Sequence, residues 1–193
     1  MKLIEEKKPD INLIYSDLEQ HFPKTELKDK NVFEKILTIP EYKVFHIVNN
    51  GTACGYFTFL EFPDRTILID YIAIYKNFRG KGGGSKTFDY IKEQMNYLGC
   101  YLEVEKENPD DINTTRRIRF YQKQGAQLLN MNYIYPNHQG HLPMDLYFMP
   151  FDENYFPKKE DIFNNIKLSF DKLHFDIDDR EKIFTKIQIN MSL

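Results

Sequence analysis

A cluster of glycines in the middle of the chain constrains the fold most strongly. It consists of Gly80, Gly82, Gly83 and Gly84. The residues before it (66–74) are rich in β-branched side chains, and helix-forming sequence begins at Ser85. A strand, a glycine turn and a helix N-terminus place backbone N–H groups around one concavity, where the helix dipole adds about half a positive charge. Glycines also let the backbone approach a pyrophosphate closely. With Arg79, Lys81 and Lys86 beside it, the segment predicts an anion site.

Composition excludes several classes of protein. The length of 193 residues, 41% of them hydrophobic, suits one compact domain with a small appendage. A formal net charge of −3 argues against non-specific binding of nucleic acid. Cys54 and Cys100 match no metal or redox spacing, so we expect no metal and a reduced, cytoplasmic setting. The charged N-terminus lacks the apolar run of a signal peptide, and no segment is long enough to span a membrane.

Apolar periodicity and turn residues predict an α/β order of elements. The expected strands are 2–7, 42–48, 52–62, 66–74, 100–105, 127–135 and 144–151. The expected helices are 10–22, 27–37, 85–98 and 115–124. We expect Asp10 to cap the first helix and Asn49-Asn50-Gly51 to form a hairpin turn. The order predicts a mixed α/β sheet with helices on both faces.

The composition changes after Pro157. Two apolar stripes at helical spacing follow, namely Phe163, Ile166, Phe170 and Leu173, and then Ile183, Ile187 and Met191. These stripes predict helices that bury one face. We therefore divide the chain into a main domain, residues 1–152, and a helical C-terminal extension, residues 153–193, packed on or beside it.

Three phosphate-binding chemistries compete for the glycine cluster. Residues 80–87 match the P-loop pattern G-x-x-x-x-G-K-[ST], except that Ser85 stands where the second glycine is needed. A P-loop protein also needs a later strand that ends in Asp, whereas the next strand here ends in Glu105. The dinucleotide fingerprint G-x-G-x-x-G fails at Ser85 as well, and its parallel βαβαβ repeat is missing. The third chemistry, binding of acyl-coenzyme A, is favoured by a resemblance.

Residues 71–84 closely resemble the acetyl-CoA signature of the GNAT family of N-acetyltransferases. In that family an Arg/Gln-x-x-Gly-x-Gly/Ala loop follows an apolar strand, and Arg79, Gly82 and Gly84 fill its three positions. Residues 117–126 resemble the second family block, Phe-Tyr-x-Lys-x-Gly-Phe. The resemblance covers about residues 1–150. It implies a GNAT fold, with a mostly antiparallel central sheet that splays at the coenzyme A site.

The resemblance also implies how acetyl-CoA binds. The residues themselves already predict that the backbone N–H groups of residues 79–85 hold the pyrophosphate. The resemblance adds that the backbone of the preceding strand would pair with the pantetheine arm. An asparagine in the loop before the next helix would touch coenzyme A, here Asn113 or, alternatively, Asn108. The residues expected to bind acetyl-CoA are Ile72, Ala73, Ile74, Arg79, Gly80, Lys81, Gly82, Gly83, Gly84, Ser85 and Asn113.

The resemblance assigns the proton donor to Tyr121, which would protonate the leaving thiolate. A phenol with a pKa near 10 is protonated at neutral pH and suits this role. A core aromatic beside Ile118 is the alternative. The candidate bases for the amine are Glu103, Glu105, Asp70, Glu61 and His46. Asp70 and Glu105 rank first, Asp70 because burial in an apolar strand raises a carboxyl pKa. A water chain without a dedicated base is a further possibility.

The sequence therefore predicts a cytoplasmic enzyme that transfers acetyl from acetyl-CoA directly to a primary amine. A small-molecule acceptor is favoured over a protein, without nucleic acid or membrane partners, in a monomer or homodimer. A coenzyme A-binding module without chemistry is the alternative from another class. A P-loop-like nucleotide-binding protein is the weaker second alternative.

Overall fold

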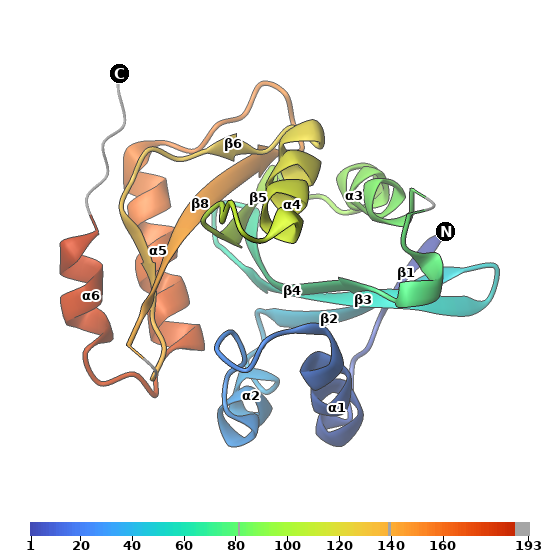
Figure 1. The fold of residues 1–193 in the computed structure, drawn as a ribbon, viewed down its shortest axis with the longest axis horizontal. Coiled ribbons are helices and arrows are strands. Elements are labelled where there is room, and N and C mark those ends of the chain that lie inside the picture. Colours follow the sequence, from blue (N-terminus) through green and yellow to red (C-terminus); the bar gives the residue numbers. More distant parts are fainter. Residues whose placement is uncertain (81, 139, 188–193) are drawn as a thin grey trace. The chain divides into compact units, whose positions relative to one another are not determined.

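The computed structural model describes residues 1–80, 82–138 and 140–187 (Figure 1). Lys81, and Met191 of the second apolar stripe, lie outside the described residues. The chain forms two compact units. The first comprises Met1–Glu61 and Ile69–Asn96, and the second comprises Phe62–Leu68 and the chain from Tyr97 onward.

The first unit is a sheet covered by helices on both sides (Figure 1). Its strands are β1 (Lys2–Glu5), β2 (Tyr42–Asn49), β3 (Thr52–Glu61) and the larger part of β4 (Thr66–Ile74). β1, β2 and β3 pair antiparallel in that order. The helices α1 (Ile11–His21) and α2 (Lys30–Ile36) cover one side, and α3 (Gly83–Gln94) covers the other.

Local sequence explains the elements of the first unit. The Asp10 carboxylate accepts hydrogen bonds from the N–H groups of Asn12 and Leu13 at 2.8 and 3.4 Å, so the predicted cap of α1 is confirmed. Asn50 and Gly51 both have positive φ (49° and 80°), which confirms the hairpin turn. The core of this unit contains fully buried aromatic rings, among them Phe33 of α2 and Phe57 and Phe59 of β3.

The second unit is organised around its longest strand. That strand, β8 (Leu142–Pro150), pairs antiparallel with β5 (Gly99–Glu105), β6 (Gln127–Leu128) and β7 (Tyr133–Tyr135). Its helices are α4 (Ile112–Lys123), α5 (Lys159–Leu173) and α6 (Arg180–Lys186). The rings of Phe163 on α5 and Phe184 on α6 lie 4.6 Å apart. The C-terminal helices thus belong to the same compact unit as β5–β8, and the expected boundary at residue 152 remains a prediction.

Several predicted elements differ from the structure, among them the following three. The expected single strand 127–135 is wrong, because the N–H groups of Met131 and Tyr133 donate to carbonyls two residues back and interrupt the pairing. α4 begins three residues earlier than expected, since Asp111 caps it by accepting from the Asn113 N–H at 2.9 Å. α3 begins at Gly83 rather than Ser85.

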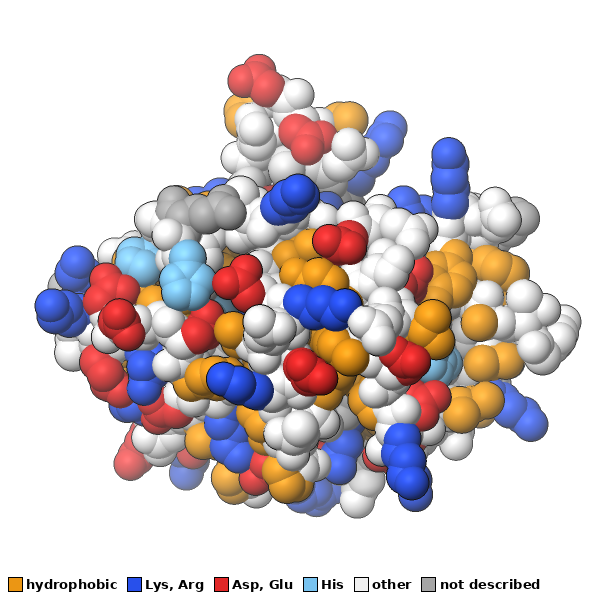
Figure 2. All heavy atoms as spheres, turned by 90° about the horizontal axis from the view of Figure 1, so that it is seen from below, with side chains coloured by type: hydrophobic (Ala, Val, Ile, Leu, Met, Phe, Trp, Pro, Cys, Tyr) orange, Lys and Arg blue, Asp and Glu red, His pale blue; other side chains and the backbone are white. Residues whose placement is uncertain are grey.

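The surface carries charges of both signs. On the face seen in Figure 2, Lys and Arg side chains are scattered among Asp, Glu and apolar side chains. In the described part of the chain, no helix combines the length and the apolar character needed to cross a membrane.

Candidate active site

The glycine cluster of the first unit folds as a strand end, a short turn and a helix start. After β4, residues 76–78 form one 3-10 turn, and α3 starts at Gly83. Gly80 and Gly82 have φ values of +73° and +75°, in the left-handed region that favours glycine. The predicted strand, glycine turn and helix are therefore present.

The N-terminus of α3 has the properties of an anion site. Gly82 is the capping residue, and it contributes no side-chain hydrogen bond. A Cβ atom built on Gly80 or Gly82 would meet no heavy atom within 4 Å, so the space beside this backbone is open. The first-turn N–H groups of a helix have no partner inside the helix, and its dipole favours negative charge there. This backbone fits a pyrophosphate.

Arg79 holds this loop to the strand before it. Its Nε donates to the carbonyl oxygen of Ile74 at 2.7 Å, while the residue remains exposed. The guanidinium is therefore anchored by one N–H and keeps other N–H groups for an anion.

The resemblance to a P-loop does not extend to the geometry. Thr87 stands where a P-loop presents a hydroxyl to magnesium, but it is fully buried and donates to the carbonyl of Gly83 at 2.9 Å. A fully buried hydroxyl is not presented to a metal ion as a P-loop requires, so the geometry does not support the P-loop alternative.

The strand end expected to meet pantetheine has an unusually close neighbour. A Cβ at Gly55 of β3 would lie 2.1 Å from the carbonyl oxygen of Ala73, so only glycine allows this approach. Ala73 is buried, whereas Ile72 and Ile74 are half-buried. Gly55 was not singled out from the sequence. A glycine inside an apolar strand was the available signal.

The second unit holds the other predicted residues. Tyr121 is half-buried on α4, and its carbonyl accepts from the Ala126 N–H at 3.0 Å beyond the helix end. Glu105 ends β5 and forms an ion pair with Arg117 of α4. The Asn113 amide is exposed and donates to the capping carboxylate of Asp111 at 2.9 Å.

Comparison with known proteins agrees with this geometry. The sequence model of the acetyltransferase (GNAT) family matches residues 10–126, which include the glycine loop and α4. The chain belongs to the GNAT acetyltransferase family. YjbC of Bacillus subtilis (strain 168), a provisionally named acetyltransferase, is 33% identical over 110 residues. This match covers 57% of the chain and 54% of YjbC, so the chain spans about half the length of that relative.

Solved structures show the GNAT fold. A GNAT-family protein from Bacteroides thetaiotaomicron has a TM-score of 0.75 at 21% identity, covering 91% of this chain and 98% of that one. An aminoglycoside 6′-N-acetyltransferase complexed with coenzyme A has a TM-score of 0.54 at 13% identity, covering 82% and 99%. The predicted family and α/β fold are therefore confirmed.

Asp70 lies in a buried network of the GNAT fold's first unit. Its Oδ1 is 2.6 Å from Lys28 Nζ, and the two side chains are only 2% and 5% exposed. Its Oδ2 accepts from the Tyr42 hydroxyl at 2.7 Å. The Tyr42 hydroxyl has only one proton, which it donates to Asp70. The Thr58 hydroxyl, 2.7 Å away, therefore donates to the Tyr42 oxygen. Both carboxylate oxygens are engaged, and the role of Asp70 as a base remains a prediction.

The other candidate bases also have polar neighbours. Glu103 of β5 accepts a hydrogen bond from the Tyr133 hydroxyl. His46 lies 3.8 Å from Glu6, and Glu61 lies 4.0 Å from Lys43. Glu105 is 24% exposed, which makes it more accessible than Asp70.

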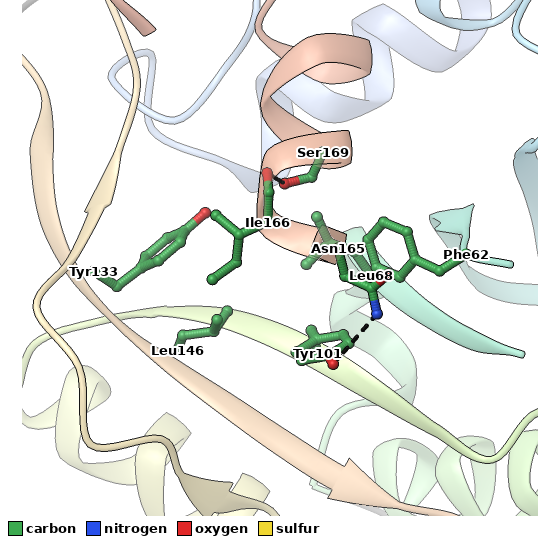
Figure 3. A pocket seen from close by; sticks show the side chains of 8 residues that line it. All are labelled: Phe62, Leu68, Tyr101, Tyr133, Leu146, Asn165, Ile166 and Ser169. Carbon is green, nitrogen blue, oxygen red and sulfur yellow. Dashed lines mark hydrogen bonds between the residues drawn. The ribbon is translucent and has the colours of Figure 1, made fainter. Parts of the chain in front are cut away.

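A small cavity in the second unit lies between α5 and the strands β5, β7 and β8 (Figure 3). Its volume is about 10 Å³, which is room for about one water. The Asn165 amide lies over it, 3.4 Å from the Tyr101 hydroxyl and 2.8 Å from Asp64. This cavity is too small for an acceptor and is part of the core.

Proposed function

We propose that this GNAT protein is an acetyl-CoA-dependent N-acetyltransferase that acts on a primary amine of a small molecule. The observation that carries the proposal is the left-handed Gly82 at the start of α3, with open space beside its backbone. It lies within the residues matched by the family. We also propose a cytoplasmic location, since both cysteines are buried and neither forms a disulfide within the described residues.

The first unit would hold acetyl-CoA. The N–H groups at the start of α3 and the anchored Arg79 would bind the pyrophosphate. The backbone of Ile72, Ala73 and Ile74 would pair with the pantetheine arm. Asn113 is proposed as a further contact, once its amide leaves Asp111.

Bound acetyl-CoA supplies a thioester whose acetyl carbon passes from sulfur to the amine nitrogen. The ammonium must first lose a proton, and Glu105 is the more accessible of the two leading candidates for the base. The Tyr121 phenol would then protonate the thiolate as it leaves. Cys54 and Cys100 are both buried, which supports direct transfer without a covalent enzyme species.

A small cationic acceptor is proposed from the side chains of the second unit. β5, β7 and β8 carry acidic and aromatic residues, among them the hydrogen-bonded pair Glu103 and Tyr133. Acidic and aromatic groups together favour an ammonium group over a neutral or anionic acceptor.

Thermal-shift measurements test the donor. A ligand at a hundred times its Kd adds about 2.7 kcal/mol to stability, which is readily measured. We expect acetyl-CoA and coenzyme A to raise Tm, and ATP with magnesium to leave it unchanged. Stabilisation by ATP–magnesium alone would contradict the proposal.

Acetyl transfer tests the chemistry. Release of the free thiol of coenzyme A is followed with a panel of polyamines, aminoglycosides, amino acids and peptides. Tyr121→Phe should lower kcat about 100-fold with the best acceptor, as expected for loss of a general acid. Its Tm shift with acetyl-CoA should be retained, and Tyr90→Phe on α3 serves as the matched control. A Tm shift with no thiol release from any amine would favour the non-catalytic coenzyme A-binding module.

A further inference from the structure

A hollow of about 360 Å³ lies in the first unit between α1 and the strands beneath it. α1 contributes Asp17 and Ile14, β2 contributes Val44, β3 contributes Tyr56, and Tyr75 follows the end of β4. This volume lies within the range of small-molecule sites, about 300–1,000 Å³. Apolar and aromatic side chains contribute most of the lining, and Ser16, Gln20 and His46 add polar groups beside Asp17.

The Tyr56 hydroxyl is a buried polar group without a partner. Tyr56 is 3% exposed, and its hydroxyl makes no hydrogen bond to any of the described residues. Buried hydroxyl groups nearly always have a partner in native proteins, so an exception needs an explanation. A ligand in the hollow that Tyr56 lines would supply the missing partner.

Asp17 brings a carboxylate to the same place. Its Oδ2 accepts from the Tyr75 hydroxyl at 3.0 Å, and its Oδ1 is 3.8 Å from His21 Nδ1. The same Nδ1 lies 2.8 Å from the backbone carbonyl oxygen of Asp17. Because a carbonyl oxygen can only accept, Nδ1 carries a proton and donates it to that oxygen. Oδ1 is therefore left to accept from another donor.

Two phenol rings stand beside this carboxylate. The Tyr56 and Tyr75 rings have centroids 6.3 Å apart at 57°, and His21 stacks on Tyr75 at 5.6 Å. Burial, and then the charge of Asp17, raise the pKa of Tyr56 well above its ordinary value and that of Tyr75 to about 12. Both phenols are thus neutral at physiological pH, and both feel the negative charge of Asp17.

The charges around the hollow select the sign of its occupant. None of the described residues that line it is a Lys or Arg, and the lining His46 lies 3.8 Å from Glu6. An anion would be repelled by Asp17, and a neutral alcohol would satisfy Tyr56 but leave the carboxylate without a counter-charge. A cation with N–H donors satisfies both groups.

We propose that this hollow binds the primary ammonium group of a small organic molecule. The ammonium donates to Asp17 Oδ1 and to the Tyr56 hydroxyl oxygen, and the phenol rings favour its charge. The apolar body of the ligand lies against Ile14 and Val44. Three N–H donors distinguish a primary amine from a quaternary one, which cannot donate to Tyr56.

The hollow is distinct from the glycine loop of the same unit. Successive side chains of a strand point to opposite faces. Ile74 lies toward α3, where its Cγ2 is 3.6 Å from a Cβ built on Gly83, whereas Tyr75 contacts His21 of α1. The inference does not rest on the proposed acetyl transfer, since a protein without that activity would still bind the amine here.

Calorimetric titration of the full chain at pH 7, without acetyl-CoA, tests the proposal. The probes are n-butylamine, n-hexylamine and phenethylamine, with trimethylphenethylammonium and phenethyl alcohol as analogues that lack the N–H donors or the charge. We expect saturable binding of at least one primary amine, and at least tenfold weaker binding of its analogues. Absence of binding by all three amines, or equal binding of the analogues, would overturn it.

Substitutions place the ligand in the hollow. Asp17→Asn and Tyr56→Phe should each weaken amine binding at least tenfold. Tyr56→Phe should remain folded because its hydroxyl has no hydrogen-bond partner among the described residues. Glu19→Gln removes an exposed carboxylate from the same helix and should bind as the wild type does. Wild-type affinity in Tyr56→Phe or Asp17→Asn, with circular dichroism unchanged, would show that the amine binds elsewhere.

Discussion

Two carboxylates of the first unit, Asp70 and Asp17, differ sharply in their surroundings. Asp70 is 2% exposed and is held by Lys28 at 2.6 Å and by the Tyr42 hydroxyl at 2.7 Å. Asp17 is 27% exposed, keeps one oxygen beyond hydrogen-bond distance of His21, and faces a buried phenol without a partner. Removing a charge from water is costly unless that charge is paired and hydrogen-bonded. Asp70 is paired and hydrogen-bonded by residues of the protein itself, whereas Asp17 has one oxygen that a ligand would pair.

The difference separates a structural carboxylate from a binding one. A buried ion pair does little for stability compared with well-packed apolar residues, but breaking it leaves an uncompensated charge. Asp70 should therefore matter for folding, and Asp17 should matter for binding. Substitutions at the two positions test whether Asp70 and Asp17 differ in this way.

The largest expected effect is the loss of the buried pair. Lys28→Met and Asp70→Asn should each lower the free energy of unfolding by about 3–5 kcal/mol, because each leaves a buried charge without its counter-charge. Asp17→Asn, the matched change at the other carboxylate, should cost less than about 1 kcal/mol, since its charge is partly solvated. Urea unfolding followed by circular dichroism measures all three values.

A double variant distinguishes the pair from catalysis. Lys28→Met/Asp70→Leu should recover part of the loss, because an apolar pair can replace a buried ion pair. If Asp70→Asn instead keeps its stability and only acetyl transfer falls, the structural role is wrong and Asp70 acts as a base.

The sequence predicted the strand, the glycine turn and the helix start well because their determinants are local. A strand, closely spaced glycines and a helix start within 20 residues fix the positive φ of Gly82 and the N-terminus of α3. The buried pair could not be predicted in this way, since Lys28 and Asp70 are 42 residues apart in the chain. The pattern showed that Asp70 stands in an apolar strand, but only the fold shows which cation neutralises it.

The difference between local and long-range determinants also explains which secondary-structure elements were predictable and why the hollow was not. The turn at Asn50-Gly51 and the cap at Asp10 were predictable because each depends on neighbouring residues. The break between β6 and β7 was not, since it depends on N–H groups that turn back on their own segment. The hollow depends on Asp17 and Tyr56, from α1 and β3, whose juxtaposition no local pattern records.

Two tyrosines give a smaller contrast. Tyr42→Phe should lower the free energy of unfolding by about 1–3 kcal/mol, because one oxygen of buried Asp70 then loses its donor. Tyr56→Phe should leave stability within about 0.5 kcal/mol of the wild type, or raise it, because its buried hydroxyl has no partner to lose. Urea titrations of the two variants in parallel give the comparison. An equal loss in both would show that Tyr56 has a partner after all and would weaken the case for a ligand.

The smallest effect is the response of Tyr75 to alkali. Burial, and then the charge of Asp17, raise the pKa of Tyr75 to about 12, whereas an unfolded tyrosine titrates near pH 10. Between these values the unfolded chain has lost a proton that the fold retains, so stability falls as pH rises from about 10 to about 12. Below pH 10 this contribution is fully present. Tyr75→Phe should make the fall shallower in urea titrations at several pH values, and Asp17→Asn should do so to a lesser degree. Tyr90→Phe on α3 is the control. A slope that Tyr75→Phe leaves unchanged would show that the raised pKa of Tyr75 does not cause the fall, and a slope that Asp17→Asn leaves unchanged would show that Asp17 and Tyr75 are not coupled.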